Sequence, residues 1–155
     1  MARQSAGLLM YRRREGALEV FLVHPGGPFW ARKDLGVWSI PKGEFAPEEN
    51  PLQAARREFA EETGFTADGE VVPLAPLKLS SRKVVHAWAV EGDVDAAALR
   101  SNTFTMEWPP GSGQQQQFPE VDRGEWYAIE AARQKISKGQ AGLLEQLARI
   151  VPGAA

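Results

Sequence analysis

The chain has 155 residues, of which 43% are hydrophobic, a net charge of −2 and no cysteine. This length fits a single domain over residues 1–155, and the apolar fraction is too high for a disordered chain. The lack of cysteine excludes a disulfide scaffold, a thiolate zinc site and a cysteine nucleophile.

The charges are nearly balanced, with 18 basic and 20 acidic residues. This balance argues against a protein that binds nucleic acid or an anionic membrane non-specifically. No apolar run reaches the roughly 18 residues that a membrane span needs. We therefore expect a cytoplasmic protein with neither nucleic acid nor a membrane as its partner.

The N-terminal third predicts β structure. Apolar runs at 5–12 and 18–24 flank a polar turn that contains Gly16, a pattern typical of a β-hairpin. A third short apolar run at 37–40 is expected to be a strand that stops at Pro41.

The clearest predicted helix spans residues 50–63. Asn50 is a good N-cap, and Pro51 occupies the first helical position, where its missing N–H costs nothing. Gly64 follows the helix and is suited to end it.

The C-terminal half predicts more strands and a final helix. Strands are expected near 71–80, 83–90 and 125–129, and apolar residues spaced by three and four predict a helix at about 139–151. The segment at about 101–119 is rich in proline, glycine and glutamine, so we interpret it as a long loop and leave a lid role open. This order of elements favours a mixed α/β layered domain.

Three carboxylates share one face of the predicted helix. On a helical wheel, Glu58, Glu61 and Glu62 lie beside the apolar stripe that contains Phe59. Taken alone, such a triplet is most simply a solvated acidic face. At the border of a buried stripe, however, the trio is partly desolvated and repulsive, so it needs a cation. Oxygen ligands without histidine or cysteine select a hard ion, Mg²⁺ or Mn²⁺.

These glutamates belong to a longer pattern of fixed positions. Its members are Gly43, Glu49, Arg57, Glu58, Glu61, Glu62 and Gly64. Phe59 and Phe65 fill two hydrophobic positions, although Phe59 is bulkier than the aliphatic residue more usual there. With these residues, the segment 43–65 resembles the Nudix box, the signature of the Nudix hydrolases, a family that includes MutT-like enzymes.

The resemblance implies an α/β fold, the Nudix-type α/β/α sandwich with a mixed β-sheet. It also implies hydrolysis of a pyrophosphate bond in a nucleoside diphosphate-linked substrate, with Mg²⁺ or a substitute Mn²⁺ and no organic cofactor. Glu58, Glu61 and Glu62 are then expected to hold the metal, and a main-chain carbonyl at Lys42 or Gly43 to complete its coordination. Glu58 and Glu61 are also counted among the catalytic residues.

Arg57 and Glu49 are expected to support the site. A fork-shaped salt bridge between them would fix the loop over the helix. Direct metal contact by Glu49 is the alternative.

A further carboxylate is expected outside the box. The segment 118–126 is similar to a stretch in diadenosine-polyphosphate hydrolases, where a glutamate precedes a tryptophan-bearing strand. Glu120 is therefore the candidate for an extra metal ligand or the general base, with Asp122 or Glu125 as alternatives.

Substrate contacts are expected at three positions. The flank of the box, Pro41–Lys42–Gly43, and the segment that begins at Lys83 also resemble those hydrolases, so Lys42 and Lys83 are candidates for phosphate binding. Trp30 is a candidate for stacking on a nucleobase. His86, in an apolar strand, is more simply a packed residue than a catalyst.

The preferred substrate class is a dinucleoside polyphosphate such as diadenosine tetraphosphate. One alternative is a MutT-like nucleoside triphosphate pyrophosphohydrolase. A second, of another class, is a Nudix module that senses a nucleotide without cleaving it. The partner is then a small nucleotide, and the protein is expected to be a monomer or a homodimer.

Overall fold

The structure is a computed structural model and describes residues 3–80 and 82–151. Its first two strands, β1 (Arg3–Arg14) and β2 (Ala17–Pro25), form the predicted antiparallel hairpin. The turn between them places Glu15 at φ 53° and Gly16 at φ 81°, a left-handed pair that matches the twist of a tight hairpin.

A mixed sheet forms the centre of the molecule. The strand order is β4-β6-β1-β2-β9, with β3 added to β1 and β5 added to β6. The central β1 and β6 run parallel, and the other pairs are antiparallel. The bounds of the remaining strands are Lys42–Glu44 for β3, Val71–Pro73 for β4, Leu77–Ser80 for β5, Lys83–Glu91 for β6 and Val121–Ala128 for β9.

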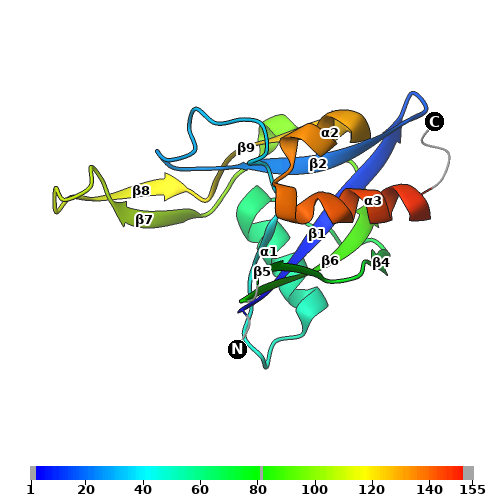
Figure 1. Cartoon of the computed structure of the whole chain (residues 1–155), viewed down its shortest axis with the longest axis horizontal. Helices are drawn as coiled ribbons and strands as arrows, with labels where there is room; N and C mark the ends of the chain where they lie inside the picture. Colours follow the sequence, from blue (N-terminus) through cyan, green and yellow to red (C-terminus); the bar gives the residue numbers. More distant parts are fainter. Residues whose placement is uncertain (1–2, 81, 152–155) are drawn as a thin grey trace.

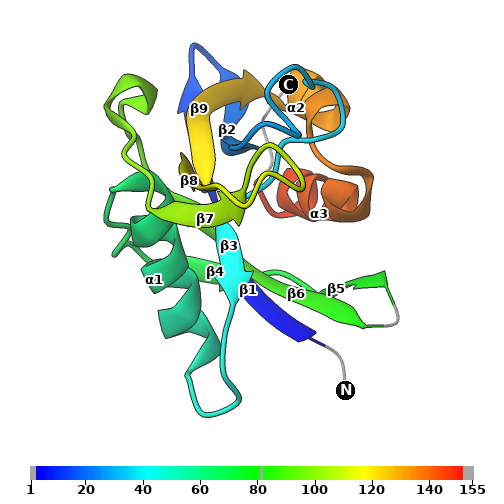
Figure 2. The same ribbon diagram turned by 90° about the vertical axis from the view of Figure 1, so that its left-hand side faces the viewer.

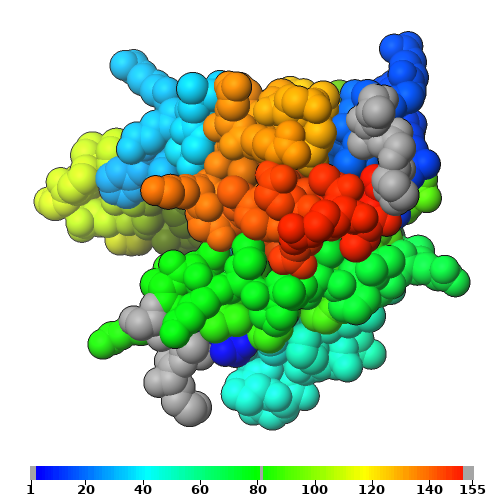
Figure 3. All heavy atoms as spheres, turned by 45° about the vertical axis from the view of Figure 1, so that its right-hand side comes forward, coloured from blue at the N-terminus to red at the C-terminus, as the bar shows by residue number. Residues whose placement is uncertain are grey.

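Helices cover both faces of this sheet, as Figure 2 shows. α1 (Pro51–Thr63) packs on one face over a core that includes Leu8, Phe21 and Phe59. The short α2 and the C-terminal α3 cover the other face, and Figure 3 shows α3 between α2 and the β5–β6 edge. The expected α/β/α sandwich is confirmed. The bounds are Ile129–Lys135 for α2 and Ala141–Ile150 for α3, with short 3₁₀ turns at Ala96–Ala98 (η1) and Lys138–Gln140 (η2).

The segment 101–119 corrects the sequence prediction of a long loop. Thr103–Glu107 (β7) and Gln115–Pro119 (β8) form an antiparallel hairpin that projects from the body of the protein (Figure 1). At its tip, the Glu107 carboxylate accepts hydrogen bonds from the backbone N–H groups of Gly111 and Gly113, at 2.9 and 3.0 Å. The prediction was wrong because turn-forming residues occupy only the tip.

Smaller differences lie at three other segments. The run 37–40 makes only isolated bridges, Val23 to Ser39 and Trp38 to Ile136, instead of a strand. The expected strand at 71–80 is divided into β4 and β5 around Pro76, since proline cannot donate to a ladder. The last strand, β9, starts four residues earlier than expected, at Val121, and leads into α2, which the sequence did not predict.

Among the described residues, no helix is long and apolar enough to cross a membrane.

Candidate active site

The structure confirms the predicted residues at both ends of α1. The Asn50 side chain accepts a hydrogen bond from the Gln53 N–H at 3.0 Å, and Pro51 opens the helix. Gly64 ends it in a left-handed conformation, with its N–H on the Ala60 carbonyl. Fixed caps and a buried stripe set the rotation of the helix, and this rotation determines where its glutamates point.

Glu58 lies directly over Gly43 of β3. A Cβ atom at residue 43 would overlap the Glu58 carboxylate, so only glycine leaves room for it. The Glu58 side chain is 13% exposed. Burial raises the pKa of Glu58, a hydrogen bond from Arg57 opposes this, and the charges of Glu61 and Glu120 add to it.

Glu62 is the most deeply placed carboxylate of the trio. It accepts a hydrogen bond from the Lys42 N–H at 3.3 Å, and burial raises its pKa to about 8. The charges of Glu58 and Glu120 raise the pKa further, against the effect of Lys42. The fold thus brings Glu120 into the electrostatic neighbourhood of two box glutamates, as the sequence predicts.

Arg57 organises the exposed side of this cluster. Its Nε and second guanidinium nitrogen donate to the two oxygens of Glu49 at 2.8 and 3.0 Å, which is the expected fork. Its remaining nitrogen donates to Glu58 at 2.9 Å and to Glu61 at 3.2 Å. The hydrogen bonds that Arg57 donates to Glu49 lower the pKa of Glu49 and raise the pKa of Arg57.

The backbone of Glu120 is held on both sides. Its N–H donates to the Asn102 carbonyl at 2.9 Å, at the base of the β7–β8 hairpin. Its carbonyl accepts from the N–H of Gly26, just after β2, also at 2.9 Å. The next residue, Val121, donates to the Ser101 hydroxyl at 3.0 Å. The hairpin and the end of β2 together fix this loop.

Lys42 lines two cavities. The first, of about 180 Å³, is also lined by Glu62 and Glu120. The second, of about 200 Å³, is also lined by Glu44 and by Arg3 and Lys83, which are register partners on β1 and β6. Lys42 therefore lies between a cavity with two acidic residues and one with two further basic residues.

The third candidate for substrate contact, Trp30, lines neither cavity. Its side chain lies on the surface, where the residue is 40% exposed and the Lys33 ammonium is 5.3 Å from the ring centroid. Beside it, Phe29 contacts Trp108 of the hairpin with ring centroids 5.5 Å apart. No local sequence signal predicts this pair, because its two segments are about eighty residues apart.

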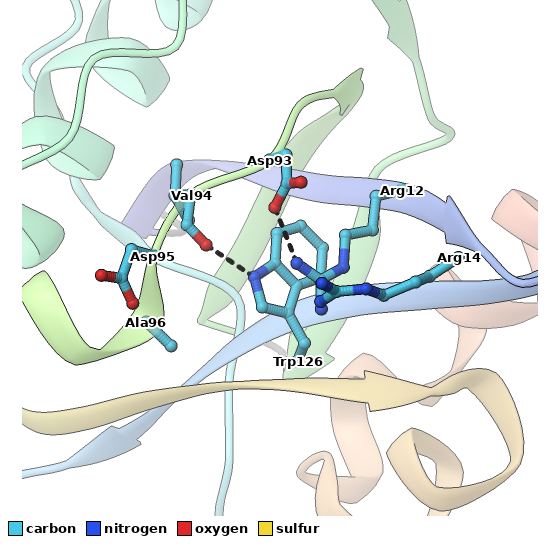
Figure 4. A pocket seen from close by; sticks show the side chains of 7 residues that line it. All are labelled: Arg12, Arg14, Asp93, Val94, Asp95, Ala96 and Trp126. Carbon is cyan, nitrogen blue, oxygen red and sulfur yellow. Dashed lines mark hydrogen bonds and ion pairs between the residues drawn. The ribbon is translucent and has the colours of Figure 1, made fainter.

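A third cavity, of about 510 Å³, lies near the β1–β2 turn and is not lined by any of the box glutamates (Figure 4). There the Arg12 guanidinium lies 4.1 Å from the centroid of the Trp126 ring. Its nitrogens donate to Glu19 at 2.7 Å and Asp93 at 2.6 Å. The Trp126 indole N–H donates to the Val94 carbonyl. Because these groups already satisfy one another, we assign no function to this cavity.

The donor set suits a hard divalent ion. Within residues 3–80 and 82–151, no three histidine or acidic side chains are already gathered tightly enough to hold a metal. Glu58 and Glu62 nevertheless have raised pKa values because they are buried among like charges, an environment that a cation would relieve. The ligand atoms that these glutamates would offer to a metal are all oxygens, which Mg²⁺ and Mn²⁺ prefer.

Comparison with known proteins identifies the family. The model of the NUDIX domain family matches residues 1–147. The chain belongs to the NUDIX domain family. This agrees with the box at 43–65, with the sandwich fold and with the expectation of a pyrophosphohydrolase.

Solved Nudix structures share the fold. A C. elegans Ap4A hydrolase in a binary complex is 22% identical, with a TM-score of 0.61 and coverage of 96% of this chain and 97% of that one. The NUDIX domain of Shewanella oneidensis NrtR, complexed with ADP ribose, is 16% identical, with a TM-score of 0.67 and coverage of 97% and 90%.

A curated relative matches over a short stretch. An RNA pyrophosphohydrolase of Erythrobacter litoralis is 50% identical over 36 residues. That stretch is 23% of this Nudix chain and 22% of the relative's length.

Proposed function

We propose that this Nudix protein hydrolyses a pyrophosphate bond in a dinucleoside polyphosphate such as diadenosine tetraphosphate. The observation that carries the proposal is the position of Lys42, which lines both a cavity with Glu62 and Glu120 and a cavity with Arg3 and Lys83. The first suits a metal-bound reaction centre, and the second suits phosphates beyond it.

The carboxylates take the metal-holding roles. Glu58, Glu61, Glu62 and Glu120, with a main-chain carbonyl at Gly43, would hold Mg²⁺ or a substitute Mn²⁺. Bound there, the ion would neutralise phosphate charge and lower the pKa of the attacking water. Arg57 holds Glu49, Glu58 and Glu61 in place, and Glu120 is the candidate to accept the water's proton.

Lys42 and Lys83 would bind the phosphates as point charges. Arg3 can join them, since its ion pair with Glu44 has a separation of 3.9 Å and is solvent-exposed on both sides. A third cation favours a chain of several phosphates over a single diphosphate. Trp30, with its exposed ring, remains the candidate to stack on a nucleobase.

Two alternatives define the test. A MutT-like enzyme would prefer nucleoside triphosphates, and a sensing module would bind a nucleotide without turnover. The intact box argues against the second, because a sensor has no need of all the metal-holding glutamates.

The experiment is a turnover assay with Mg²⁺ over a panel of dinucleoside tetraphosphate, nucleoside triphosphates, ADP-ribose and 5′-triphosphorylated RNA. Running it in ¹⁸O-water identifies the phosphorus that is attacked, because the label enters one product. We expect the highest kcat/KM for the tetraphosphate and no turnover in EDTA. Preference for a triphosphate would favour the MutT-like alternative, and binding without turnover the sensing module.

A further inference from the structure

His24 is a fully buried histidine near the end of β2. Its exposed fraction is 0%, and its ring meets the buried Trp38 edge-on, with centroids 5.2 Å apart. The sequence motifs assign no role to His24, and the proposed chemistry does not use it. It is one of only two histidines in the chain.

Both ring nitrogens of His24 have partners that accept hydrogen bonds. Nε2 lies 2.6 Å from the Lys33 carbonyl oxygen, and Nδ1 lies 2.9 Å from Oδ1 of Asp122. A carbonyl oxygen can only accept, so Nε2 carries a proton. Nδ1 is hydrogen-bonded to the Asp122 carboxyl group. Both ring nitrogens of His24 are therefore used, one toward each neighbouring segment.

A β-bulge directs Asp122 toward this ring. In the β2–β9 ladder, His24 pairs with Arg123 and Pro25 pairs with Val121, which leaves Asp122 as the extra residue. Bulges of this kind redirect a side chain and are frequent beside active sites. The local irregularity of β9 is thus what lets a strand residue reach a buried ring on the neighbouring strand.

The two partners of His24 belong to two different segments of the chain. Asp122 is two residues after Glu120, whose backbone is already bonded to Gly26 and Asn102. Lys33 lies in the 26–37 segment, which carries the exposed Trp30 and runs beside the β7–β8 hairpin (Figure 1). The buried His24 ring therefore connects the Glu120 loop to the 26–37 segment through two hydrogen bonds.

We propose that His24 is a positioning residue that fixes Glu120 for the reaction through its bond to Asp122. This inference rests on the proposed function, in which Glu120 holds the metal or accepts a proton. Backbone bonds determine where the Glu120 main chain lies, and the His24–Asp122 bond prevents the following residues from rotating out of the bulge. Positioning of this kind affects the chemical step more than substrate binding.

His86 offers a matched control. Its Nε2 faces the Gln4 side-chain amide, which can serve as donor or acceptor, and its ring packs 6.1 Å from that of Phe45. His86 is partly buried and, like His24, belongs to a strand of the central sheet. Among the described residues, its side chain is hydrogen-bonded to Gln4 and not to the Glu120 loop. His86→Phe removes a strand histidine without touching the link.

The test is a double-mutant cycle on turnover. We expect His24→Phe to lower kcat at least tenfold with KM changed less than about threefold, and His86→Phe to leave both near the wild-type values. In a Glu120→Gln background, His24→Phe should cause little further loss of kcat, because the residue that it positions is already disabled. A normal kcat for His24→Phe, or an equal fractional loss with and without Glu120, would overturn the proposal.

Two further measurements keep the test independent of folding and of turnover. If His24→Phe does not fold, Asp122→Ala breaks the same link at an exposed side, and the same cycle with Glu120→Gln decides. In ¹⁵N-labelled protein, with His86→Phe used for assignment, Asp122→Ala should shift the His24 Nδ1 resonance and leave Nε2, bonded to the Lys33 carbonyl, nearly unchanged. No shift at Nδ1 would overturn the link even in an active enzyme. A shifted Nδ1 resonance in a protein without turnover would contradict the proposed function alone.

Discussion

At Gly43, the space that a side chain would fill is taken by the Glu58 carboxylate. The first position of the box is thus constrained by a residue of α1, fifteen residues later in the chain. We expect Gly43→Ala to displace Glu58 and lower kcat about 100-fold, since a shift of about 1 Å at a reacting centre has effects of this size.

The matched control for this change is Gly69→Ala. A Cβ there would lie at ordinary contact distance, 3.5 Å from Val90, and would meet none of the box glutamates within 4 Å. Steady-state kinetics on both variants, with circular dichroism to verify folding, measures the effect. Similar kinetics for the two would show that the Glu58 contact does not matter for turnover.

Glu62 gives a prediction for the metal. Mg²⁺ at about 100 times its Kd should stabilise the native protein by about 2.7 kcal/mol, which raises Tm by about 5–10 °C for a domain of this size. Glu62→Gln should abolish most of this rise, because a neutral amide is a weaker ligand than the buried carboxylate. Thermal melts with Mg²⁺ and with EDTA measure it, with the exposed Glu70→Gln as control. An undiminished rise in Glu62→Gln would remove this residue from the metal site.

At the scale of elements, Asp34 joins the 26–37 segment to the rest of the fold. Its carboxylate accepts hydrogen bonds from Lys135 of α2 and from the buried Trp38 indole, and these bonds, Lys135 first, hold the pKa of Asp34 below its ordinary value of 3.8. A lowered carboxyl pKa stabilises the folded state above the ordinary value, and this stabilisation is lost as pH falls through the folded pKa.

We therefore expect Asp34→Asn to lower Tm at pH 7 and this effect to shrink as pH falls below 3.8 toward the lowered pKa of the folded carboxyl. The asparagine oxygen can still accept from Trp38, so the variant isolates the charge. Thermal melts from pH 7 to pH 3 measure the difference, with the exposed Asp68→Asn as control. A Tm difference that is constant over this range would assign the effect to packing rather than to the charge.

The elements differ in how well the sequence predicts them, and the difference follows from where their stabilising contacts lie. α1 is predicted almost to the residue because its signals are local: Asn50, Pro51 and Gly64 act within one turn of its ends. The β7–β8 hairpin is missed because little of it is buried, so its apolar alternation, at Phe104 and Met106, is weak against the turn-forming tip.

The candidate site shows the same distinction. The spacing of the box glutamates predicts that they share one face of a helix, and the resemblance to the Nudix box adds the prediction that they hold a metal. His24 and Asp122 escape sequence reasoning because they are 98 residues apart and meet only through the register of β2 and β9 and its bulge. Which cavities Lys42 lines likewise depends on the pairing of β3 with β1, not on its neighbours in the chain.

At the scale of the whole molecule, one sheet separates two cores, and only one of them supports the site. Phe59 of α1 is fully buried in the core between this helix and the sheet, and α1 also carries the glutamates. Leu144 of α3 is fully buried in the core on the opposite face of the sheet. A stability loss on the two faces should therefore have different consequences for activity.

We expect Leu144→Ala to cost about 2–5 kcal/mol and Phe59→Ala about 3–5 kcal/mol, because each leaves a cavity in a packed core. At a temperature where both remain folded, Leu144→Ala should keep a near-normal kcat. Phe59→Ala should lose turnover, since it loosens the seating of α1 and with it the position of Glu58. Urea denaturation gives the stabilities, and Ile150→Ala, at a residue 43% exposed on α3, is the control with a small effect. Equal losses of kcat per folded molecule for the two core variants would mean that the sheet transmits disorder between its faces, and that α1 does not position the glutamates independently of α3.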